Sequence, residues 1–253
     1  MSNLFSVENK IVVVTGAGRG LGFSYAKGLL EHGAKVSICD NKPEILESAV
    51  KELNEAGYSV YGEAVDVTNR EQVEKFINNT IAHYGRIDCL INNAGVLLRR
   101  TPEEMTEQEW DLIMDVNMKG TFLCTQAVGK YMIKDGGGDI INVASIGAKV
   151  ALGLRLGYCT SKAAIQHFTS VLADEWGKYN IRINAIAPGY IKSDMNADLR
   201  ADPVKYKAMV DDVPLGRFGD AEDLLGTIIF LCSGASNFIS GQTIYVDGGK
   251  TTH

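Results

Sequence analysis

The segment Tyr158-Cys-Thr-Ser-Lys162 places a phenol and an amine four positions apart. Side chains at that spacing share one face of a helix, so the ammonium group can lie beneath the phenol and favour its ionised form. A phenol that normally titrates near pH ~10 would then exchange protons near neutrality. A lone pair of this kind is common in helices. Ser145 and Asn117 precede it in the chain, and the joint occurrence of all four predicts an acid–base catalytic site.

A glycine-rich stretch, Thr15-Gly16-Ala17-Gly18-Arg19-Gly20-Leu21-Gly22, follows the first apolar run. Glycines at a strand-to-helix turn allow a tight bend and let the backbone approach a pyrophosphate, whose charge the helix N-terminus stabilises. Because a turn alone favours only one or two glycines, the stretch predicts dinucleotide binding by Gly16, Arg19, Gly20, Leu21 and Gly22. The spacing departs from G-x-G-x-x-G, since Leu21 stands where that pattern has glycine.

Asp40 ends the second apolar run. A carboxylate there can accept hydrogen bonds from both hydroxyls of the adenosine ribose, and it repels a 2′-phosphate. Asp40 could instead cap the helix that begins near Pro43, and the guanidinium of Arg19 could attract a 2′-phosphate. Because a carboxylate beside a phosphate is repulsive wherever Arg19 points, we expect NAD as the cofactor, with NADP as the alternative.

The elements that position these residues follow from the alternation of compact apolar runs with longer amphipathic stretches. Several runs are nearly continuous in β-branched residues, which is typical of strands covered on both faces in a parallel sheet. The stretch from Pro43 to Gly57 opens on proline and closes on glycine, as helices often do. The pattern predicts an α/β fold, a single doubly wound Rossmann-type domain with a mostly parallel seven-stranded sheet and helices on both faces. The expected strands are Ile11–Val14, Ala34–Cys39, Val60–Val65, Ile87–Ile91, Asp139–Val143, Ile181–Ala187 and Thr243–Val246.

No linker divides the chain, so we expect one catalytic domain over residues 1–253. Gly136-Gly137-Gly138 could mark a boundary, but it stands between a helical stretch and a strand, where a tight turn is the simpler interpretation. The segment of about 190–218 mixes charged and apolar residues irregularly. Long segments of this kind are often binding lids, and we expect a substrate-binding lid here.

Composition limits the classes of protein and partner. With 45% hydrophobic residues the chain can bury a core, and its formal charge of −6 argues against binding nucleic acid or an anionic membrane. No apolar run approaches the ~18–20 residues that span a bilayer, and the first residues lack a secretory signal, so a cytoplasmic protein is expected. The five scattered cysteines fit buried thiols in a reducing compartment. No metal is expected, because ligand spacing is absent among the cysteines and among His32, His83, His167 and His253.

In these motifs and their order the chain resembles the short-chain dehydrogenase/reductase family, and the resemblance covers essentially the whole sequence. The resemblance implies an NAD(P)-dependent oxidoreductase that moves a hydride between the nicotinamide and a secondary alcohol or ketone. It also implies a homotetramer built through the helices that carry Asn117 and Tyr158 and through the C-terminal strand. The matching residues are Thr15-Gly16-x-x-x-Gly20-x-Gly22, Asp66, Asn92-Asn93-Ala94-Gly95, Asn117, Ser145, Tyr158, Lys162, Pro188-Gly189 and Val246-Asp247-Gly248-Gly249.

The resemblance also implies roles for individual residues. Tyr158 would exchange the substrate proton, and Ser145 would orient the substrate oxygen. Lys162 would hold the nicotinamide ribose and lower the pKa of Tyr158, while Asn117 would support a water-linked proton relay to Lys162. The remaining cofactor contacts would come from Asp66 and Val67 at the adenine, from Asn93 on the adenosine side with Ala94 and Gly95 beside it, and from Pro188, Gly189, Ile191 and Ser193 near the nicotinamide.

The substrate is less sharply indicated. The stretches 93–100, 175–179 and 214–219 are most similar to the gluconate 5-dehydrogenase and 2-deoxy-D-gluconate 3-dehydrogenase branch, which implies a sugar acid or polyol. A guanidinium fits a carboxylate bidentately, so Arg99, Arg100 and Arg155 are candidate substrate ligands, although the first two could equally be solvated loop residues. A basic pocket would also suit a 3-oxoacyl thioester, but Asp40 weighs against that NADPH-linked role. A catalytically inert dinucleotide sensor is the third alternative, and the intact catalytic residues argue against it.

Overall fold

The computed structural model describes residues 3–252 of the chain. Its core is one seven-stranded sheet, in which all neighbouring strands are parallel in the order β3-β2-β1-β4-β5-β6-β7. The predicted doubly wound fold is therefore confirmed, and the sheet is wholly rather than mostly parallel. The strands are β1 (Ile11–Thr15), β2 (Lys35–Asp40), β3 (Val60–Ala64), β4 (Cys89–Asn92), β5 (Gly138–Val143), β6 (Ile181–Pro188) and β7 (Thr243–Val246).

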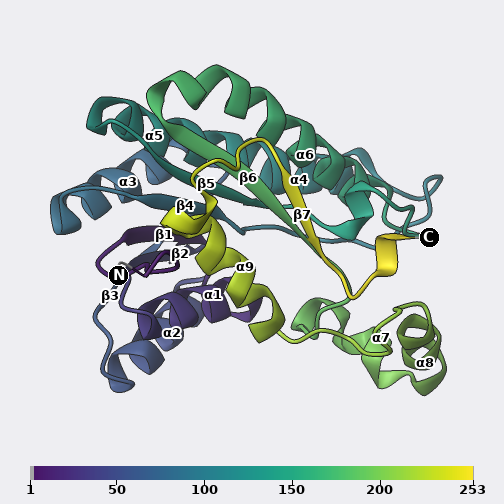
Figure 1. Ribbon diagram of the computed structural model, residues 1–253. Coiled ribbons are helices and arrows are strands. Elements are labelled where there is room, and N and C mark those ends of the chain that lie inside the picture. The colour runs from purple at the N-terminus through teal and green to yellow at the C-terminus, as the bar shows by residue number, and fades with distance from the viewer. Residues whose placement is uncertain (1–2, 253) are drawn as a thin grey trace.

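Helices cover both faces of this sheet (Figure 1). One face carries α1 (Gly20–Glu31), α2 (Pro43–Glu55) and α9 (Glu222–Cys232), and the other carries α3 (Arg70–Tyr84), α4 (Glu107–Met114), α5 (Gly120–Asp135) and α6 (Leu156–Trp176). Successive strand residues point to opposite faces, so Val12 and Val14 enter one apolar core while Val13 enters the other. The continuous apolar runs of the sequence therefore reflect burial on both sides.

The three consecutive glycines form the expected helix-to-strand turn. α5 ends at Asp135 and β5 begins at Gly138. Gly136 and Gly137 between them have φ angles of 88° and 136°, a region that side chains disfavour. The turn therefore needs glycine at these two positions, and no domain boundary is present there.

The segment 190–218 projects from the body of the molecule between β6 and α9 (Figure 1). It contains two short helices, α7 (Ala197–Ala201) and α8 (Pro203–Asp211), where the sequence predicted only an irregular lid. The side chain of Asp202 caps α8 by accepting hydrogen bonds from the N–H groups of Val204 and Lys205. Proline in the first turn suits the start of a helix, so local capping explains this difference.

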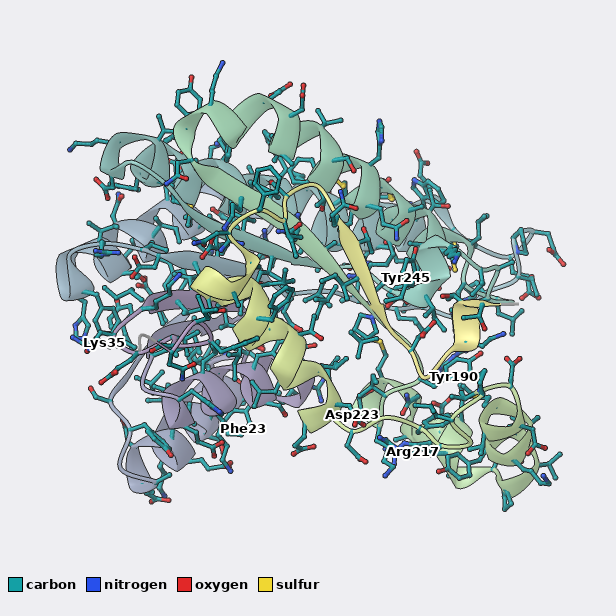
Figure 2. The ribbon with its side chains drawn as sticks, viewed as in Figure 1. Phe23, Lys35, Tyr190, Arg217, Asp223 and Tyr245 are labelled. Atoms are coloured by element: carbon teal, nitrogen blue, oxygen red, sulfur yellow. The ribbon has the colours of Figure 1, made fainter. Side chains whose placement is uncertain are left out.

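Both ends of this segment are tied to each other and to the body. The N–H of Lys192 donates to the carbonyl of Gly219, and the N–H of Gly219 donates to the carbonyl of Tyr190, each at 2.9 Å. The guanidinium of Arg217 makes hydrogen bonds of 2.7 and 2.8 Å to the carboxylate of Asp223 in the first turn of α9 (Figure 2). This pairing holds the pKa of Asp223 well below its usual range. The segment thus leaves and rejoins the body at one fixed point.

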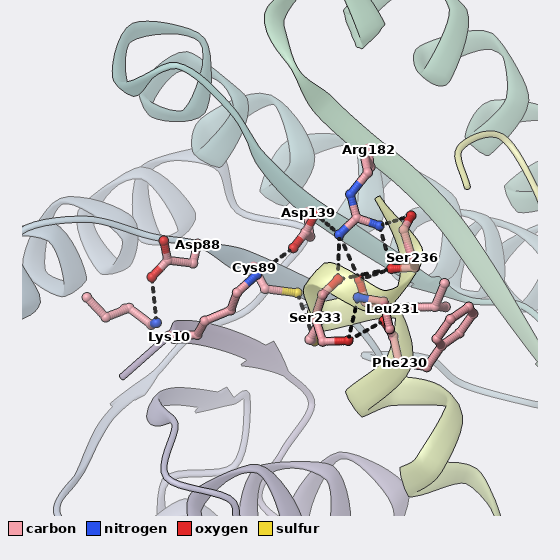
Figure 3. Close-up of polar contacts among 12 residues, drawn as sticks. Lys10, Asp88, Cys89, Asp139, Arg182, Phe230, Leu231, Ser233 and Ser236 are labelled. Atoms are coloured by element: carbon pink, nitrogen blue, oxygen red, sulfur yellow. Dashed lines mark hydrogen bonds and ion pairs between the residues drawn. The ribbon is translucent and has the colours of Figure 1, made fainter. Parts of the chain in front are cut away.

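An ionic network around the buried Asp139 lies at the end of the sheet where the strands begin (Figure 3). The carboxylate of Asp139 pairs with Lys10 at 3.1 Å and with Arg182 at 2.6 Å. Arg182 also donates to the carbonyl oxygens of Ser233 and Ser236, at 3.2 and 2.7 Å, just beyond the end of α9. Burial raises the pKa of Asp139 in spite of the two cations. These contacts fix α9 against the sheet at the edge where the strands begin.

Within residues 3–252, no helix is long and apolar enough to cross a membrane. Over the same residues, no group of three or more His, Cys, Asp or Glu side chains is placed to hold a metal ion. All five cysteines are free. His253 lies outside the described residues.

Candidate active site

The predicted site residues cluster at the edge where the parallel strands end. Strands β1 and β4 are neighbours in the sheet, and their connections leave in opposite directions, toward β2 and β5. In doubly wound sheets such a switch point opens a crevice that binds ligands. By this rule a ligand is expected where the glycine-rich turn after β1 and the segment that follows β4 come together.

The glycine-rich turn fits a pyrophosphate. Gly16 and Gly20 have φ angles of 61° and 60°, and α1 begins at Gly20 without a side-chain cap on its first turn. A Cβ atom at Gly20 would meet no heavy atom within 4 Å, so the space before the helix N-terminus is open. Uncapped N–H groups facing open space are the donors that a phosphate accepts from. Leu21, the departure from the usual pattern, packs against the core below α1.

The side chain of Asn93 makes hydrogen bonds that could not be predicted from the sequence. Its side-chain amide donates to the carbonyl oxygens of Thr15 and Gly16, at 3.0 and 2.9 Å. In return the hydroxyl of Thr15 accepts hydrogen bonds from the N–H groups of Asn93 and Ala94, both at 3.1 Å. A Cβ at Gly16 would lie 2.7 Å from the Cα of Ala94, which explains the glycine. The glycine-rich turn and the segment after β4 are thus held together by these hydrogen bonds.

The acidic residues predicted at the adenosine end lie at the ends of β2 and β3. Asp40 Oδ2 accepts a hydrogen bond of 3.1 Å from the N–H of Gly18, which puts the carboxylate against the glycine-rich turn. Asp66 is exposed, and its Oδ1 accepts hydrogen bonds from the N–H and hydroxyl of Thr68 at 2.9 and 2.8 Å. Val67 is buried against Gly120 at the start of α5. The carboxylate of Asp40 is therefore the acidic group that contacts this turn.

Ser145 and Tyr158 come together although they belong to different elements. Ser145 follows β5, and its Oγ accepts a hydrogen bond of 3.1 Å from the N–H of Gly147. Tyr158 lies in the first turn of α6, and its phenol is close enough to the side chain of Ser145 for the two to interact. Burial raises the pKa of Tyr158, and the interaction with Ser145 opposes that rise. The pair can hold one substrate oxygen between a hydroxyl and a phenol.

Lys162 stands beneath this pair, 5.8 Å from the centroid of the Tyr158 ring. Its Nζ donates a hydrogen bond of 2.7 Å to the carbonyl oxygen of Val143, the last residue of β5. Burial lowers the pKa of Lys162 from 10.5 to about 8. The expectation that Lys162 lowers the pKa of Tyr158 stays a prediction, because here its ammonium group is directed at Val143.

Asn117 occupies a π-helical turn, Asp115–Lys119, that joins α4 to α5. Its buried amide donates to the carbonyl of Val96 at 3.0 Å and to the hydroxyl of Ser161 at 2.9 Å. Its Oδ1 accepts from the N–H of Val96 at 2.8 Å. The proton-relay role stays a prediction, and Ser161 is a partner that sequence reasoning did not single out.

The residues predicted near the nicotinamide line the start of the projecting segment. Pro188 ends β6, and a Cβ at Gly189 would lie 2.6 Å from the Cα of Asp247. Ile191 is buried and forms an isolated bridge with Gly219. Ser193 donates its N–H to the Oδ1 of Asn196 at 3.2 Å. The projecting segment therefore begins where β6 ends, on the same side of the sheet as the other predicted site residues.

The three candidate arginines do not share one environment. Arg99 donates to Asp198 and to the carbonyl of Met195, each at 3.0 Å, so it contacts the projecting segment. Arg155 is half-buried, and burial together with the charge of Arg99 lowers its pKa. Tyr158 is among the groups whose charge acts on Arg155. Arg100 instead pairs with Glu109 of α4 at 2.9 Å. Arg99 and Arg155 are therefore better placed than Arg100 to meet a substrate.

Comparisons with known proteins agree with this geometry. A family described as enoyl-(acyl carrier protein) reductase matches residues 16–251. The chain is 38% identical to the 2-dehydro-3-deoxy-D-gluconate 5-dehydrogenase of Escherichia coli K12, covering 97% of this chain and 96% of that one. It is 39% identical to an NAD-dependent glycerol dehydrogenase of Listeria innocua, covering 98% and 96%.

A solved structure is also closely similar. It is a gluconate 5-dehydrogenase from Burkholderia cenocepacia J2315 in complex with NADP and tartrate, with a TM-score of 0.95, 34% identity and coverage of 99% and 98%. The family resemblance inferred from the motifs is thereby confirmed over nearly the full length. The chain belongs to the short-chain dehydrogenase/reductase family of oxidoreductases.

Proposed function

We propose that the protein is an NAD-dependent dehydrogenase that interconverts a secondary alcohol and a ketone of a sugar acid or polyol. The observation that carries the proposal is the grouping of Ser145, Tyr158 and the buried Lys162 where the parallel strands end, with the amine of Lys162 5.8 Å from the centroid of the Tyr158 ring. The names of three relatives support the substrate class, since they refer to 2-dehydro-3-deoxy-D-gluconate, glycerol and gluconate.

The residues of the chain divide the proton chemistry between them. A nicotinamide dinucleotide, when bound, exchanges a hydride with the substrate carbon. In the oxidative direction Tyr158 removes the hydroxyl proton, and in the reductive direction it returns the proton. Ser145 holds the same oxygen, at which charge develops as the proton moves. The ammonium of Lys162 favours the phenolate form of Tyr158, because opposite charges stabilise each other.

Asp40 supports NAD in preference to NADP. Its carboxylate contacts the N–H of Gly18 and would lie beside a 2′-phosphate on the adenosine ribose. Arg19 stands in the same turn, immediately before α1, and is the residue that could attract that phosphate. Relatives of both kinds are known, because the glycerol dehydrogenase is NAD-dependent and the gluconate 5-dehydrogenase structure contains NADP. We propose NAD because the carboxylate of Asp40 would repel the 2′-phosphate of NADP.

Two neighbouring cations, Arg99 and Arg155, support an acidic substrate, and the charge of Arg155 acts on Tyr158. Arg99 and Arg155 are close enough for the charge of one to lower the pKa of the other. The Nε of Arg99 is buried without a hydrogen-bond partner among the described residues. A substrate carboxylate would accept from this donor and relieve the repulsion between the two guanidinium groups. Since Arg99 also binds Asp198, we propose that the segment 190–218 acts as a lid over the acid.

A substrate panel tests the proposal. Gluconate, 2-deoxygluconate, glycerol, a sugar alcohol and an acetoacetyl thioester are each assayed with NAD(H) and with NADP(H). We expect turnover of a sugar acid or polyol with NAD, and loss of turnover by at least about a thousandfold in Tyr158→Phe with unchanged NADH binding. Reduction of the thioester alone, with NADPH, would support the acyl-carrier-protein reductase alternative. NADH binding without turnover of any compound would support the inert sensor.

Assembly and location belong to the same proposal. Leu112, Phe122 and Val171 are large apolar residues exposed on α4, α5 and α6, and such surfaces are commonly covered in oligomers. A homotetramer would cover them, and sedimentation showing a monomer at micromolar concentration would contradict this. The free thiols of all five cysteines support a reducing, cytoplasmic location.

A further inference from the structure

We infer that Ser161 is a positioning residue that holds Tyr158 in its catalytic place. Its side chain is completely buried on α6. The hydroxyl accepts a hydrogen bond of 2.9 Å from Nδ2 of Asn117 and donates one of 2.7 Å to the main-chain oxygen of Tyr158. The inference rests on the proposed function, because it requires Tyr158 to be the acid–base group.

The side-chain amide of Asn117 has only one orientation that satisfies its partners. One N–H donates to the carbonyl of Val96, and the other donates to Ser161, while Oδ1 accepts from the N–H of Val96. Rotating the amide would place an acceptor against the carbonyl of Val96 and leave buried groups unpaired. The hydroxyl proton of Ser161 is directed at Tyr158, so the hydroxyl presents its lone pairs to Asn117. Directed hydrogen bonds therefore run from Val96 through Asn117 and Ser161 to Tyr158.

This chain of hydrogen bonds joins three parts of the site that are distant in sequence. Val96 follows β4, Asn117 lies in the π-helical turn, and Tyr158 lies in the first turn of α6. A Cβ at Gly95 would lie 3.5 Å from the Nζ of Lys162, so the segment after β4 also borders the lysine. Misplacing a catalytic group by about 1 Å can cost about a hundredfold in rate. The hydroxyl of Ser161 is the link through which the fixed backbone of Val96 sets the position of Tyr158.

A second buried hydroxyl on the same helix provides a matched comparison. Thr169 is also completely buried. Its hydroxyl accepts a hydrogen bond of 2.9 Å from Nδ2 of Asn142 and donates one of 2.8 Å to the main-chain oxygen of Ile165. Thr169 thus makes the same pair of bonds as Ser161, but it lies about two turns further along α6, away from Tyr158. Deleting either hydroxyl leaves one buried asparagine N–H without its acceptor.

The experiment compares Ser161→Ala, which deletes the hydroxyl group, with Thr169→Val, which replaces the hydroxyl with a methyl group. Each variant loses one hydrogen-bond donor and acceptor. For both variants we measure kcat and KM with the substrate found in the panel, the Kd for NADH by fluorescence, and the midpoint of thermal unfolding. We expect similar losses of thermal stability. We expect kcat to fall at least tenfold in Ser161→Ala and at most twofold in Thr169→Val, with the Kd for NADH within threefold of wild type in both.

Other outcomes overturn the inference or separate it from the proposed function. A kcat for Ser161→Ala within twofold of that for Thr169→Val would show that Ser161 only packs the helix. If Ser161→Ala does not fold, Ser161→Cys replaces it, since a thiol of similar shape is a much weaker donor and acceptor and the same loss of kcat is expected. Absence of turnover by the wild-type protein would instead refute the proposed function.

Discussion

The carboxylate of Asp40 and the main-chain N–H of Gly18 are joined by a hydrogen bond of 3.1 Å. The other oxygen of the carboxylate accepts from the N–H of Lys42, also at 3.1 Å. A Cβ at Gly18 would lie 2.9 Å from Oδ2 of Asp40, so the two residues are in direct contact. The acidic end of β2 and the turn after β1 therefore form one continuous surface, and a substitution at Asp40 acts directly on the turn.

Asp40→Asn should narrow the preference for NAD over NADP. The amide keeps an oxygen that can accept from Gly18, but it removes the charge that repels a 2′-phosphate. We expect the ratio of kcat/KM with NAD to kcat/KM with NADP to fall by about tenfold or more, which corresponds to about 1.4 kcal/mol. Glu47→Gln, an exposed charge deletion on α2, is the control. An unchanged ratio in Asp40→Asn would remove the basis for choosing NAD.

Arg99→Gln should impair the use of an acidic substrate selectively. A hydrogen bond to a charged group contributes about 1.5–3 kcal/mol, so loss of the guanidinium should raise KM for a sugar acid by about 10- to 100-fold. The KM for a neutral polyol should change less than threefold.

Arg100→Gln is the matched control for this prediction. Arg100 precedes α4 and pairs with Glu109, so its loss should leave both KM values nearly unchanged. If Arg100→Gln raises KM for the acid and Arg99→Gln does not, the neighbouring arginine is the substrate ligand.

Lys162→Met should stabilise the nucleotide-free protein at pH 7. Burial lowers the pKa of Lys162 from 10.5 in the unfolded chain to about 8, so holding its charge in the folded protein costs free energy. That cost is complete below pH 8, declines as the pH rises from 8 to 10.5, and vanishes above. Loss of the bond to Val143 offsets part of the gain, which leaves about 1–2 kcal/mol.

Urea unfolding at pH 7 and pH 10 measures this difference. The difference in the free energy of unfolding between Lys162→Met and wild type should be smaller at pH 10 than at pH 7. Lys51→Met removes the positive charge of an exposed lysine on α2 and is the control. A variant less stable than wild type at pH 7 would contradict the sign of the prediction.

Tyr25→Phe should also stabilise the protein. Tyr25 is completely buried on α1, and its hydroxyl has no hydrogen-bond partner among the described residues. Burial raises the pKa of Tyr25, in keeping with an apolar surrounding. Removing the unpaired hydroxyl should gain about 1 kcal/mol and raise the Tm by about 2–4 °C.

Tyr84→Phe provides the comparison, because the hydroxyl of Tyr84 donates to the carbonyl of Val36 at 3.2 Å. Calorimetry should show a lower Tm for Tyr84→Phe than for wild type. Equal effects of the two substitutions would mean that the hydroxyl of Tyr25 has a partner, such as a buried water.

The sequence predicts the features of this protein that depend on local pattern. Apolar runs predict the strands, and the glycine cluster with Asp40 predicts the nucleotide end. The i, i+4 spacing of Tyr158 and Lys162 places both on one helix. These predictions succeed because the alternation of side chains along a strand, the repeat of side chains around a helix and the backbone freedom of glycine are properties of short segments.

Features that depend on distant contacts could not be predicted in this way. The amide of Asn93 bonds to residues near the N-terminus, and Ser161 depends on Asn117, which only the folded topology brings close. The pairing of Arg100 with Glu109 likewise depends on where α4 lies. In each example the residue type permits several partners, and the packing of whole elements selects one.

The hydrogen bonds between Asn93 and Thr15 have a consequence for folding while the chain is being synthesised on the ribosome. The bonded residues are 78 positions apart, so the glycine-rich turn leaves the ribosome long before the segment to which it bonds. Contacts of such sequence separation form late, because the intervening chain must first be ordered. A nascent chain that ends before β4 therefore carries the complete glycine-rich turn but lacks Asn93, whose amide bonds to the carbonyl oxygens of Thr15 and Gly16.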